Sequence, residues 1–211
     1  MLVKAKAKYF LDTLSAYYPD AQIELCFNKK DPWQLLVAVA LSAQTTDKAV
    51  NKVTPDLFKA YPTVKKFAKA SVKDVEGYVK TLGFFRNKAK NLVAAAQMVL
   101  ERFKGKIPKE RKLLENIPGV GPKTAAVIIA NAFGTPAIAV DTHVGRVGRR
   151  LGLTKQTDPS KVEAELTALF PKKRLLEAHH VLIFHGRRIC FARKPKCLEC
   201  PVVSRCPRVG L

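Results

Sequence analysis

The chain has 211 residues, of which 47% are hydrophobic, so it can bury a core in one large domain or in two small ones. It carries 38 Lys and Arg against 17 Asp and Glu, and this net charge of +21 favours a polyanionic partner such as nucleic acid. The alternative is that the charge adapts the protein surface to high temperature or increases its solubility. The apolar runs are too short to cross a bilayer and the N-terminus lacks an apolar signal core, so we expect a cytoplasmic protein.

Nearly every segment has the pattern of a helix, and no convincing pair of alternating strands is present, so the sequence predicts an all-α fold. The tetrapeptide Asp31-Pro32-Trp33-Gln34 is typical of a helix start, with an N-cap acid followed by proline in the first turn. We expect helices over residues 32–41, 47–60, 72–80 and 87–103. Cys26 stands alone near the N-terminus, and we expect it to be a small buried hydrophobe.

The second half of the chain continues with a short helical segment over 111–116, a tight turn and a helix from Pro122 to Gly134. Thr135-Pro136-Ala137 breaks the helical pattern and marks the expected domain boundary. Further helices are expected over 142–151, 159–170 and 175–189. The tail from Cys190 has three prolines and no helical period, so it needs a staple to be ordered.

The turn between these two helical segments, Ile117-Pro118-Gly119-Val120-Gly121, has the pattern of a helix-hairpin-helix. Its glycines permit positive φ and the close approach of another backbone. We expect the amides of Gly119, Gly121 and Lys123 to point outward at the positive end of a helix dipole, where a phosphate oxygen binds well. Such a motif contacts the DNA backbone rather than the bases. An ordinary helix–helix corner is the alternative.

Two residues after this turn are candidates for chemistry. Lys123 lies in the first turn of a helix, where the dipole, and burial in a cleft, would disfavour an ammonium and favour the neutral amine of a Schiff-base nucleophile. A salt bridge to a DNA phosphate fits the same position. Asp141 follows an apolar run and begins a basic helix, so it is either a helix N-cap alone or a cap that also serves catalysis.

Four cysteines lie within the last 22 residues with the spacing Cys-x6-Cys-x2-Cys-x5-Cys, namely Cys190, Cys197, Cys200 and Cys206. In a reducing compartment this cluster predicts a metal site rather than disulfides, and the four thiolates suit either zinc or an iron–sulfur cluster. Three upstream histidines are expected to be helix residues rather than ligands: His179, His180 and His185. The basic residues between the first two cysteines are expected to contact phosphates: Arg193, Lys194 and Lys196.

Together these motifs resemble the endonuclease III family. The segments IPGVGPKTA, AVDTHVGRV and LSAQTTD, together with the four-cysteine tail, match the family's pattern in order and over essentially the whole chain. The resemblance implies two all-helical domains with DNA bound between them. One is a six-helix barrel with the helix-hairpin-helix, residues 25–135. The other joins residues 1–24 to 136–211 and carries the C-terminal cluster loop.

The family's activity implies a role for each motif. The protein would be a bifunctional DNA N-glycosylase and AP lyase of base-excision repair, acting as a monomer on double-stranded DNA that carries an oxidised pyrimidine or an abasic site. Lys123 would attack C1′ of the damaged nucleotide, Asp141 would stabilise the developing positive charge, and β-elimination would follow. The four cysteines would ligate a four-iron, four-sulfur (4Fe–4S) cluster. The protein would be cytoplasmic and associated with the nucleoid.

The expected DNA contacts are Gln44, Phe84, Gly119, Val120, Gly121 and His143. Gln44 would fill the gap left by the extruded base. Phe84 would be the wedge that holds the stack open, at a position where the family usually presents leucine after glycine. The alternative is that Phe84 or Phe85 packs in the barrel core.

Three other functions compete with this interpretation. A sibling mismatch glycosylase shares the fold, but such enzymes usually lack the hairpin lysine. A non-catalytic DNA-binding module stapled by a metal would have the same charge and motifs. An electron-transfer protein would not need a phosphate-binding hairpin or a charge of +21.

Overall fold

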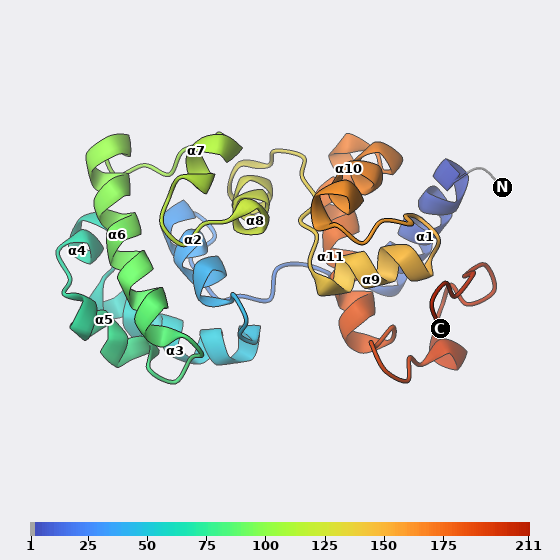
Figure 1. Ribbon diagram of the computed structural model, residues 1–211, viewed down its shortest axis with the longest axis horizontal. Coiled ribbons are helices and arrows are strands. Elements are labelled where there is room, and N and C mark those ends of the chain that lie inside the picture. Colours follow the sequence, from blue (N-terminus) through green and yellow to red (C-terminus); the bar gives the residue numbers. More distant parts are fainter. Residues whose placement is uncertain (1–2) are drawn as a thin grey trace. The chain divides into compact units, whose positions relative to one another are not determined.

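The computed structural model describes residues 3–211, and within that range it holds eleven α-helices, two short 3-10 helices and no strand. The expectation of an all-α fold is confirmed. The chain divides into two compact units (Figure 1). One is Glu24–Gly134, and the other joins the N-terminal segment up to Ile23 with Thr135–Leu211. Within residues 3–211, every helix is too short or too polar to span a bilayer.

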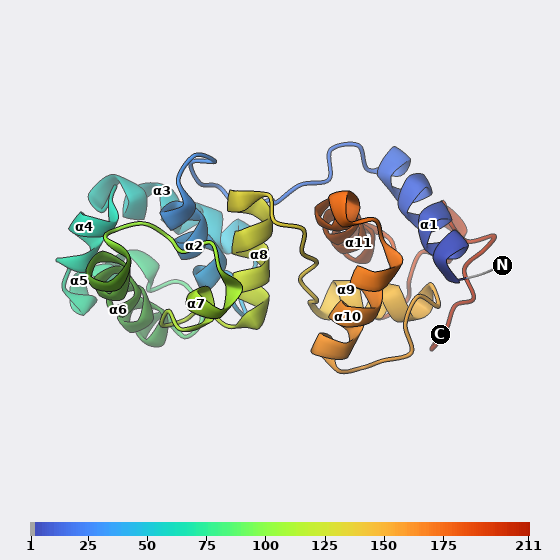
Figure 2. The same ribbon diagram turned by 90° about the horizontal axis from the view of Figure 1, so that it is seen from above.

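The unit Glu24–Gly134 is built around α2. Its helices are α2 (Pro32–Leu41), α3 (Asp47–Ala60), α4 (Val64–Ala68), α5 (Val72–Val79), α6 (Phe85–Phe103), α7 (Arg111–Glu115) and α8 (Pro122–Phe133). Apart from Gln34, helix α2 consists of apolar residues, and it packs against α3, α6 and α8 within this unit (Figures 1 and 2). The long helix α6 packs against α4 and α5.

Side-chain caps fix where four of these helices begin, namely α2, α3, α4 and α5. The carboxylate of Asp31 accepts hydrogen bonds from the amides of Trp33 at 2.9 Å and Gln34 at 3.4 Å, as the sequence predicts. Thr63 caps α4, a five-residue helix that the sequence analysis did not anticipate. Such a helix is too short to show an apolar period, because it contains little more than one turn.

The second unit contains α1 (Val3–Tyr17), α9 (Thr142–Arg150), α10 (Pro159–Leu169) and α11 (Leu175–Arg188), with 3-10 helices at Lys172–Arg174 and Cys197–Glu199. Helix α11 packs against both α1 and α9. A methyl group added at Gly186 would lie 2.9 Å from Cβ of His143, so the absence of a side chain lets α9 approach α11 closely.

One expectation about the core is wrong. Cys26 is exposed, whereas its neighbour Leu25 is buried. The backbone of Cys26 is held on both sides, because its amide donates to Oδ1 of Asn51 at 2.7 Å and its carbonyl accepts from Oγ1 of Thr54 at 3.4 Å. These two hydrogen bonds fix the backbone at Cys26 in a position that leaves its thiol exposed while Leu25 stays buried.

Candidate functional site

The hairpin between α7 and α8 is anchored to its own unit by buried residues. Ile117 and Val120 are both buried, and the amide of Val120 donates to the carbonyl of Ile117 at 3.0 Å, which closes the turn. Gly119 adopts φ +80°, and a Cβ added there would lie 3.1 Å from Cβ of Asn91 in α6. Glycine therefore satisfies both the left-handed backbone and the close approach.

The first turn of α8 is left open to an external acceptor. Its N-cap is Gly121, which has no side chain to accept from the first amides, and Pro122 follows at the first helical position. Residues 121–123 are all exposed. Amides at a helix start that lack a side-chain cap suit an anionic oxygen from another molecule.

Lys123 lies in this first turn, as the sequence analysis expected, but its side chain is exposed. The burial in a cleft that the sequence suggested is therefore not seen within this unit. The lysine stands directly beside the open amides, so an anion held by those amides would lie close to its amine.

Asp141 is the N-cap of α9. Its Oδ1 accepts a hydrogen bond from the amide of Val144 at 2.7 Å, and the residue is half-buried. The cap holds the carboxylate in one orientation, next to a helix that carries Arg146 and Arg149. Because Lys123 and Asp141 belong to different units, their cooperation stays a prediction.

His143 lies in the first turn of α9, also half-buried, with its Nδ1 at 3.1 Å from Nη2 of Arg146. Burial lowers the pKa of this histidine below its usual range. A contact between DNA and His143, or between DNA and the largely buried Val120, stays a prediction.

Three of the expected DNA contacts gather around one pocket in the unit Glu24–Gly134. Gln44, Phe84 and Gly119 all line it, although they come from the loop after α2, the start of α6 and the hairpin. The pocket is partly open to solvent and has a volume of about 200 Å³. Its other lining residues are Ala40, Ala43, Asn87, Lys88, Asn91 and Leu92.

Two of these lining residues have an unusual backbone. Gln44 has φ +52° and Phe84 has φ +57°, both in the left-handed region that side chains other than glycine rarely adopt. Such a conformation costs about 1–2 kcal/mol per residue, so the surrounding structure must hold it. Phe84 is 66% exposed, so it does not pack in the core of this structure, and Phe85 is half-buried.

Lys88 is a polar residue in the wall of this pocket that was not predicted from the sequence. It is only 9% exposed, and its Nζ donates to Oγ1 of Thr45 at 2.6 Å. Burial lowers the pKa of this lysine below its usual range. The signal was present in the period of α6, because position 88 shares one helical face with the apolar Leu92 and Val99.

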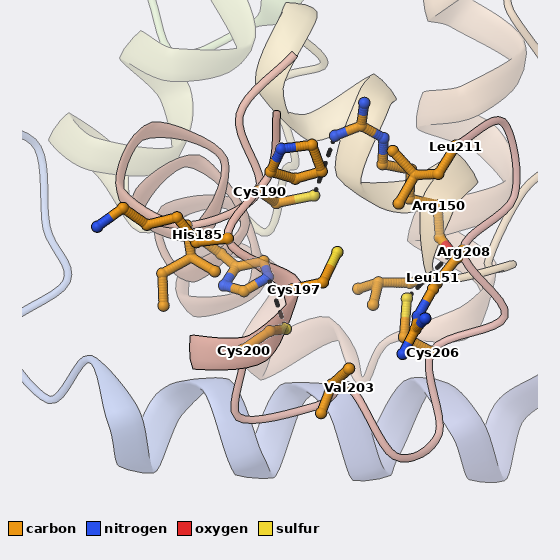
Figure 3. Close-up of a pocket in the computed structure, with 13 residues that line it drawn as sticks. Arg150, Leu151, His185, Cys190, Cys197, Cys200, Val203, Cys206, Arg208 and Leu211 are labelled. Atoms are coloured by element: carbon orange, nitrogen blue, oxygen red, sulfur yellow. Dashed lines mark hydrogen bonds between the residues drawn. The ribbon is translucent and has the colours of Figure 1, made fainter. Parts of the chain in front are cut away.

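The four cysteines of the tail line a single cavity (Figure 3). Sγ of Cys190 accepts from Nη1 of Arg150 at 3.4 Å, and Sγ of Cys200 lies 3.6 Å from Nε2 of His185. The thiol of Cys206 donates to the carbonyl of Arg150 at 3.4 Å. Within residues 3–211, no three His, Cys, Asp or Glu side chains surround one ion position, and the four thiols border a shared space instead.

Helix α9 fixes the loop that follows the first cysteine. Nη2 of Arg150 donates to the carbonyl of Ala192 at 2.9 Å, and Arg146 donates twice to the carbonyl of Cys190, at 3.1 and 3.0 Å. Four half-buried thiols beside fixed N–H donors suit an iron–sulfur cluster, since such clusters are held by thiolates whose sulfurs accept hydrogen bonds.

The histidines upstream of the tail are helix residues, as expected. His179, His180 and His185 all lie in α11 and are buried. Burial lowers the pKa of His180 to about 3 and that of His185 to about 4.

Comparison with known proteins gives consistent matches. Residues 37–172 match the HhH-GPD superfamily of base excision DNA repair proteins, and residues 190–206 match the iron–sulfur binding domain of endonuclease III. Endonuclease III of Synechocystis sp. is 45% identical over 205 residues, covering 97% of this chain and 93% of that protein. Endonuclease III of Escherichia coli K12 is 40% identical over 203 residues, covering 96% and 95%.

Solved structures agree with the sequence comparison. A trapped endonuclease III–DNA covalent intermediate has a TM-score of 0.92 at 42% identity, covering 99% of this chain and 97% of that chain. A thermostable thymine-DNA glycosylase has a TM-score of 0.87 at 25% identity, covering 97% and 96%.

Proposed function

Since this chain belongs to the endonuclease III family of base-excision repair DNA glycosylases and AP lyases, we propose that Lys123 is its Schiff-base nucleophile. The supporting observation is the position of Lys123 beside the open amides at the start of α8. A DNA phosphate bound to those amides would bring the neighbouring sugar close to the amine.

The proposed reaction begins with the amine of Lys123 beside the deoxyribose of the damaged nucleotide. Nζ of Lys123 attacks C1′ in its neutral form, and the damaged base departs with the electron pair of the broken bond and takes up a proton. The sugar ring opens to an imine between Nζ and C1′. Removal of a proton from C2′ then breaks the C3′–O bond and releases the 3′ phosphate, and hydrolysis of the imine frees the lysine. Asp141 stabilises the positive charge and assists these proton transfers.

The proposed partner is double-stranded DNA with an oxidised pyrimidine, such as thymine glycol, or an abasic site. Solved structures of related endonuclease III proteins contain DNA, which supports this partner. Extruding a nucleotide costs about a few kcal/mol, and residues that occupy the vacated space offset that cost. We assign this role to Gln44 and Phe84, with hairpin contacts to the backbone and a further contact from His143.

The C-terminal segment is the iron–sulfur binding domain of the family, and it carries a 4Fe–4S cluster. We propose that its ligands are Cys190, Cys197, Cys200 and Cys206. The cluster supplies a structural staple when bound. The chain's own basic residues in the loop, Arg193 among them, would then be fixed for contact with DNA phosphates.

We further propose that a barrel domain over residues 25–135 and a cluster domain over residues 1–24 with 136–211 are the functional domains of the chain. The protein acts as a monomer on chromosomal DNA in the cytoplasm, at the nucleoid.

A duplex assay tests the activity. The wild type should release thymine glycol and cleave an abasic site, whereas Lys123→Ala should do neither and should still bind the duplex. Lys112→Ala replaces an exposed lysine of α7 and serves as the matched control. A duplex with a thymine mismatch, assayed in parallel, tests the mismatch alternative. If the protein removes the mismatched thymine and does not act on thymine glycol, the proposed substrate is wrong.

A further inference from the structure

Lys88 is a buried cation without a carboxylate partner in the described part of the chain. Its side chain lies in the wall of the pocket formed by Gln44, Phe84 and Gly119, and its hydrogen-bond acceptor is the neutral hydroxyl of Thr45 at 2.6 Å. The only shift in its pKa comes from burial, which lowers it. The surroundings therefore do not compensate the charge with an anion.

Stability does not explain a lysine at this position. A buried ammonium loses its hydration, and one neutral hydroxyl returns only part of that loss. The same helical face carries apolar residues, so an apolar side chain of similar length would suit the fold better. A costly group kept in the wall of a binding pocket indicates a role in that pocket.

The contacts of Lys88 lead directly to the loop that carries Gln44. Oγ1 of Thr45 accepts from Nζ of Lys88 and donates to the carbonyl of Ala43 at 3.3 Å. The hydroxyl thus connects Lys88 to the residues on both sides of Gln44, whose φ is +52°. A left-handed residue between two fixed neighbours has few other conformations open to it.

The same residue also holds the other left-handed position. The amide of Lys88 donates to the carbonyl of Phe84 at 3.0 Å, and Phe84 has φ +57°. One residue of α6 therefore contacts both segments through two different groups, its ammonium and its backbone amide. Only the contact made by the ammonium depends on the identity of the side chain.

We infer that Lys88 is a positioning residue for DNA recognition, whose buried ammonium holds Thr45 and thereby fixes Gln44 in the conformation that enters the DNA. This inference rests on the proposed function of Gln44. It predicts that removal of the ammonium releases the loop, while the fold is kept or becomes more stable.

The test uses the full protein with its cluster. Lys88→Met removes the charge and keeps the length of the side chain, and Lys88→Arg keeps the charge. Lys90→Met changes an exposed lysine on the same helix and is the matched control. We expect Lys88→Met to lose about tenfold or more in single-turnover base release, because a small displacement of a positioning group is costly. Its melting temperature should not fall, and Lys88→Arg should recover part of the rate.

A double-mutant cycle separates positioning from a general effect. If Lys88 acts through Gln44, the double variant Lys88→Met with Gln44→Ala should release the base at a rate within about twofold of that of Gln44→Ala alone. If the double variant instead loses the product of the two single losses in rate, the inference is overturned. A rate for Lys88→Met within about twofold of the wild-type rate would overturn it as well. Thr45→Val should resemble Lys88→Met in rate, and Thr45→Ser, which keeps the hydroxyl, should resemble the wild type.

A binding measurement distinguishes this inference from the proposed activity. A duplex with an abasic-site analogue and 2-aminopurine opposite it reports entry into the stack without any chemistry. Wild type should raise the fluorescence, and Lys88→Met should raise it less. If wild type shows the rise but does not cleave DNA, the proposed activity fails and the positioning role stands. Equal rises for wild type and Lys88→Met would contradict the positioning role.

Discussion

Nη1 of Arg150 donates a hydrogen bond to Sγ of Cys190 at 3.4 Å. Arg150 is 7% exposed, and its Nη2 also donates to the carbonyl of Ala192. The first cysteine of the tail and the loop after it are thus held by one buried guanidinium from α9.

Replacing this arginine should loosen the cluster loop. We expect Arg150→Met to lower the iron content per protein and the melting temperature, because the carbonyl of Ala192 and the sulfur of Cys190 would lose a charged hydrogen-bond donor. Iron analysis and thermal unfolding measure both effects. Arg149→Met on the same helix is the control, and equal iron retention in the two variants would contradict the assigned role of Arg150.

The hairpin glycine offers a second test. Gly119→Ala should destabilise the protein by roughly 1–3 kcal/mol, because it forces a side chain into φ +80° and places Cβ 3.1 Å from Cβ of Asn91. DNA affinity should fall with it. Gly77→Ala in α5 meets no atom within 4 Å and should be neutral or stabilising. Urea unfolding and duplex binding compare the two, and similar stabilities would refute this account of the turn.

Phe84 should matter for DNA and not for folding. Because its side chain is 66% exposed, Phe84→Ala should leave the free energy of unfolding within about 0.5 kcal/mol of wild type while slowing base release. Phe67→Ala removes a fully buried ring and should cost about 3–5 kcal/mol. Denaturant unfolding and single-turnover kinetics measure these effects. A large stability loss for Phe84→Ala would favour the core-packing alternative.

His180 makes stability depend on pH. Its pKa in the folded protein falls to about 3 through burial, below the usual 6.5, so the unfolded chain binds more protons as the pH drops below that value. The contribution of neutral, buried His180 to the free energy of unfolding is fully present above about pH 6.5 and is lost progressively towards pH 3. The loss amounts to roughly 3 kcal/mol by pH 4.5. His180→Leu should show a smaller loss of unfolding free energy between pH 7 and pH 4.5 than wild type. If the unfolding free energy of His180→Leu depends on pH as that of the wild type does, His180 is not the source of this dependence.

Local signals in the sequence predicted much of the fold. The start of α2 was predictable because Asp31 and Pro32 supply the cap and the first turn, and the hairpin was predictable because its geometry requires glycine at position 119. These features depend on a few adjacent residues. Residue order alone was enough to place them.

Features that depend on distant contacts were not predictable in the same way. Cys26 turns outward because Asn51 and Thr54 hold its backbone from α3. The buried state of Lys88 depends on Thr45, 43 positions earlier in the chain. The order of residues also left open whether Phe84 faces the core or the solvent, since an aromatic residue next to a glycine fits both.

Borohydride trapping on a duplex that contains thymine glycol shows whether Lys123 forms a Schiff base with damaged DNA. Wild type should form a covalent protein–DNA adduct, with the modified residue mapped to Lys123 by peptide mass spectrometry. Lys123→Ala should bind the duplex and form no adduct. An adduct on another lysine, or binding by the wild type without trapping on thymine glycol or an abasic site, would contradict the Schiff-base role of Lys123.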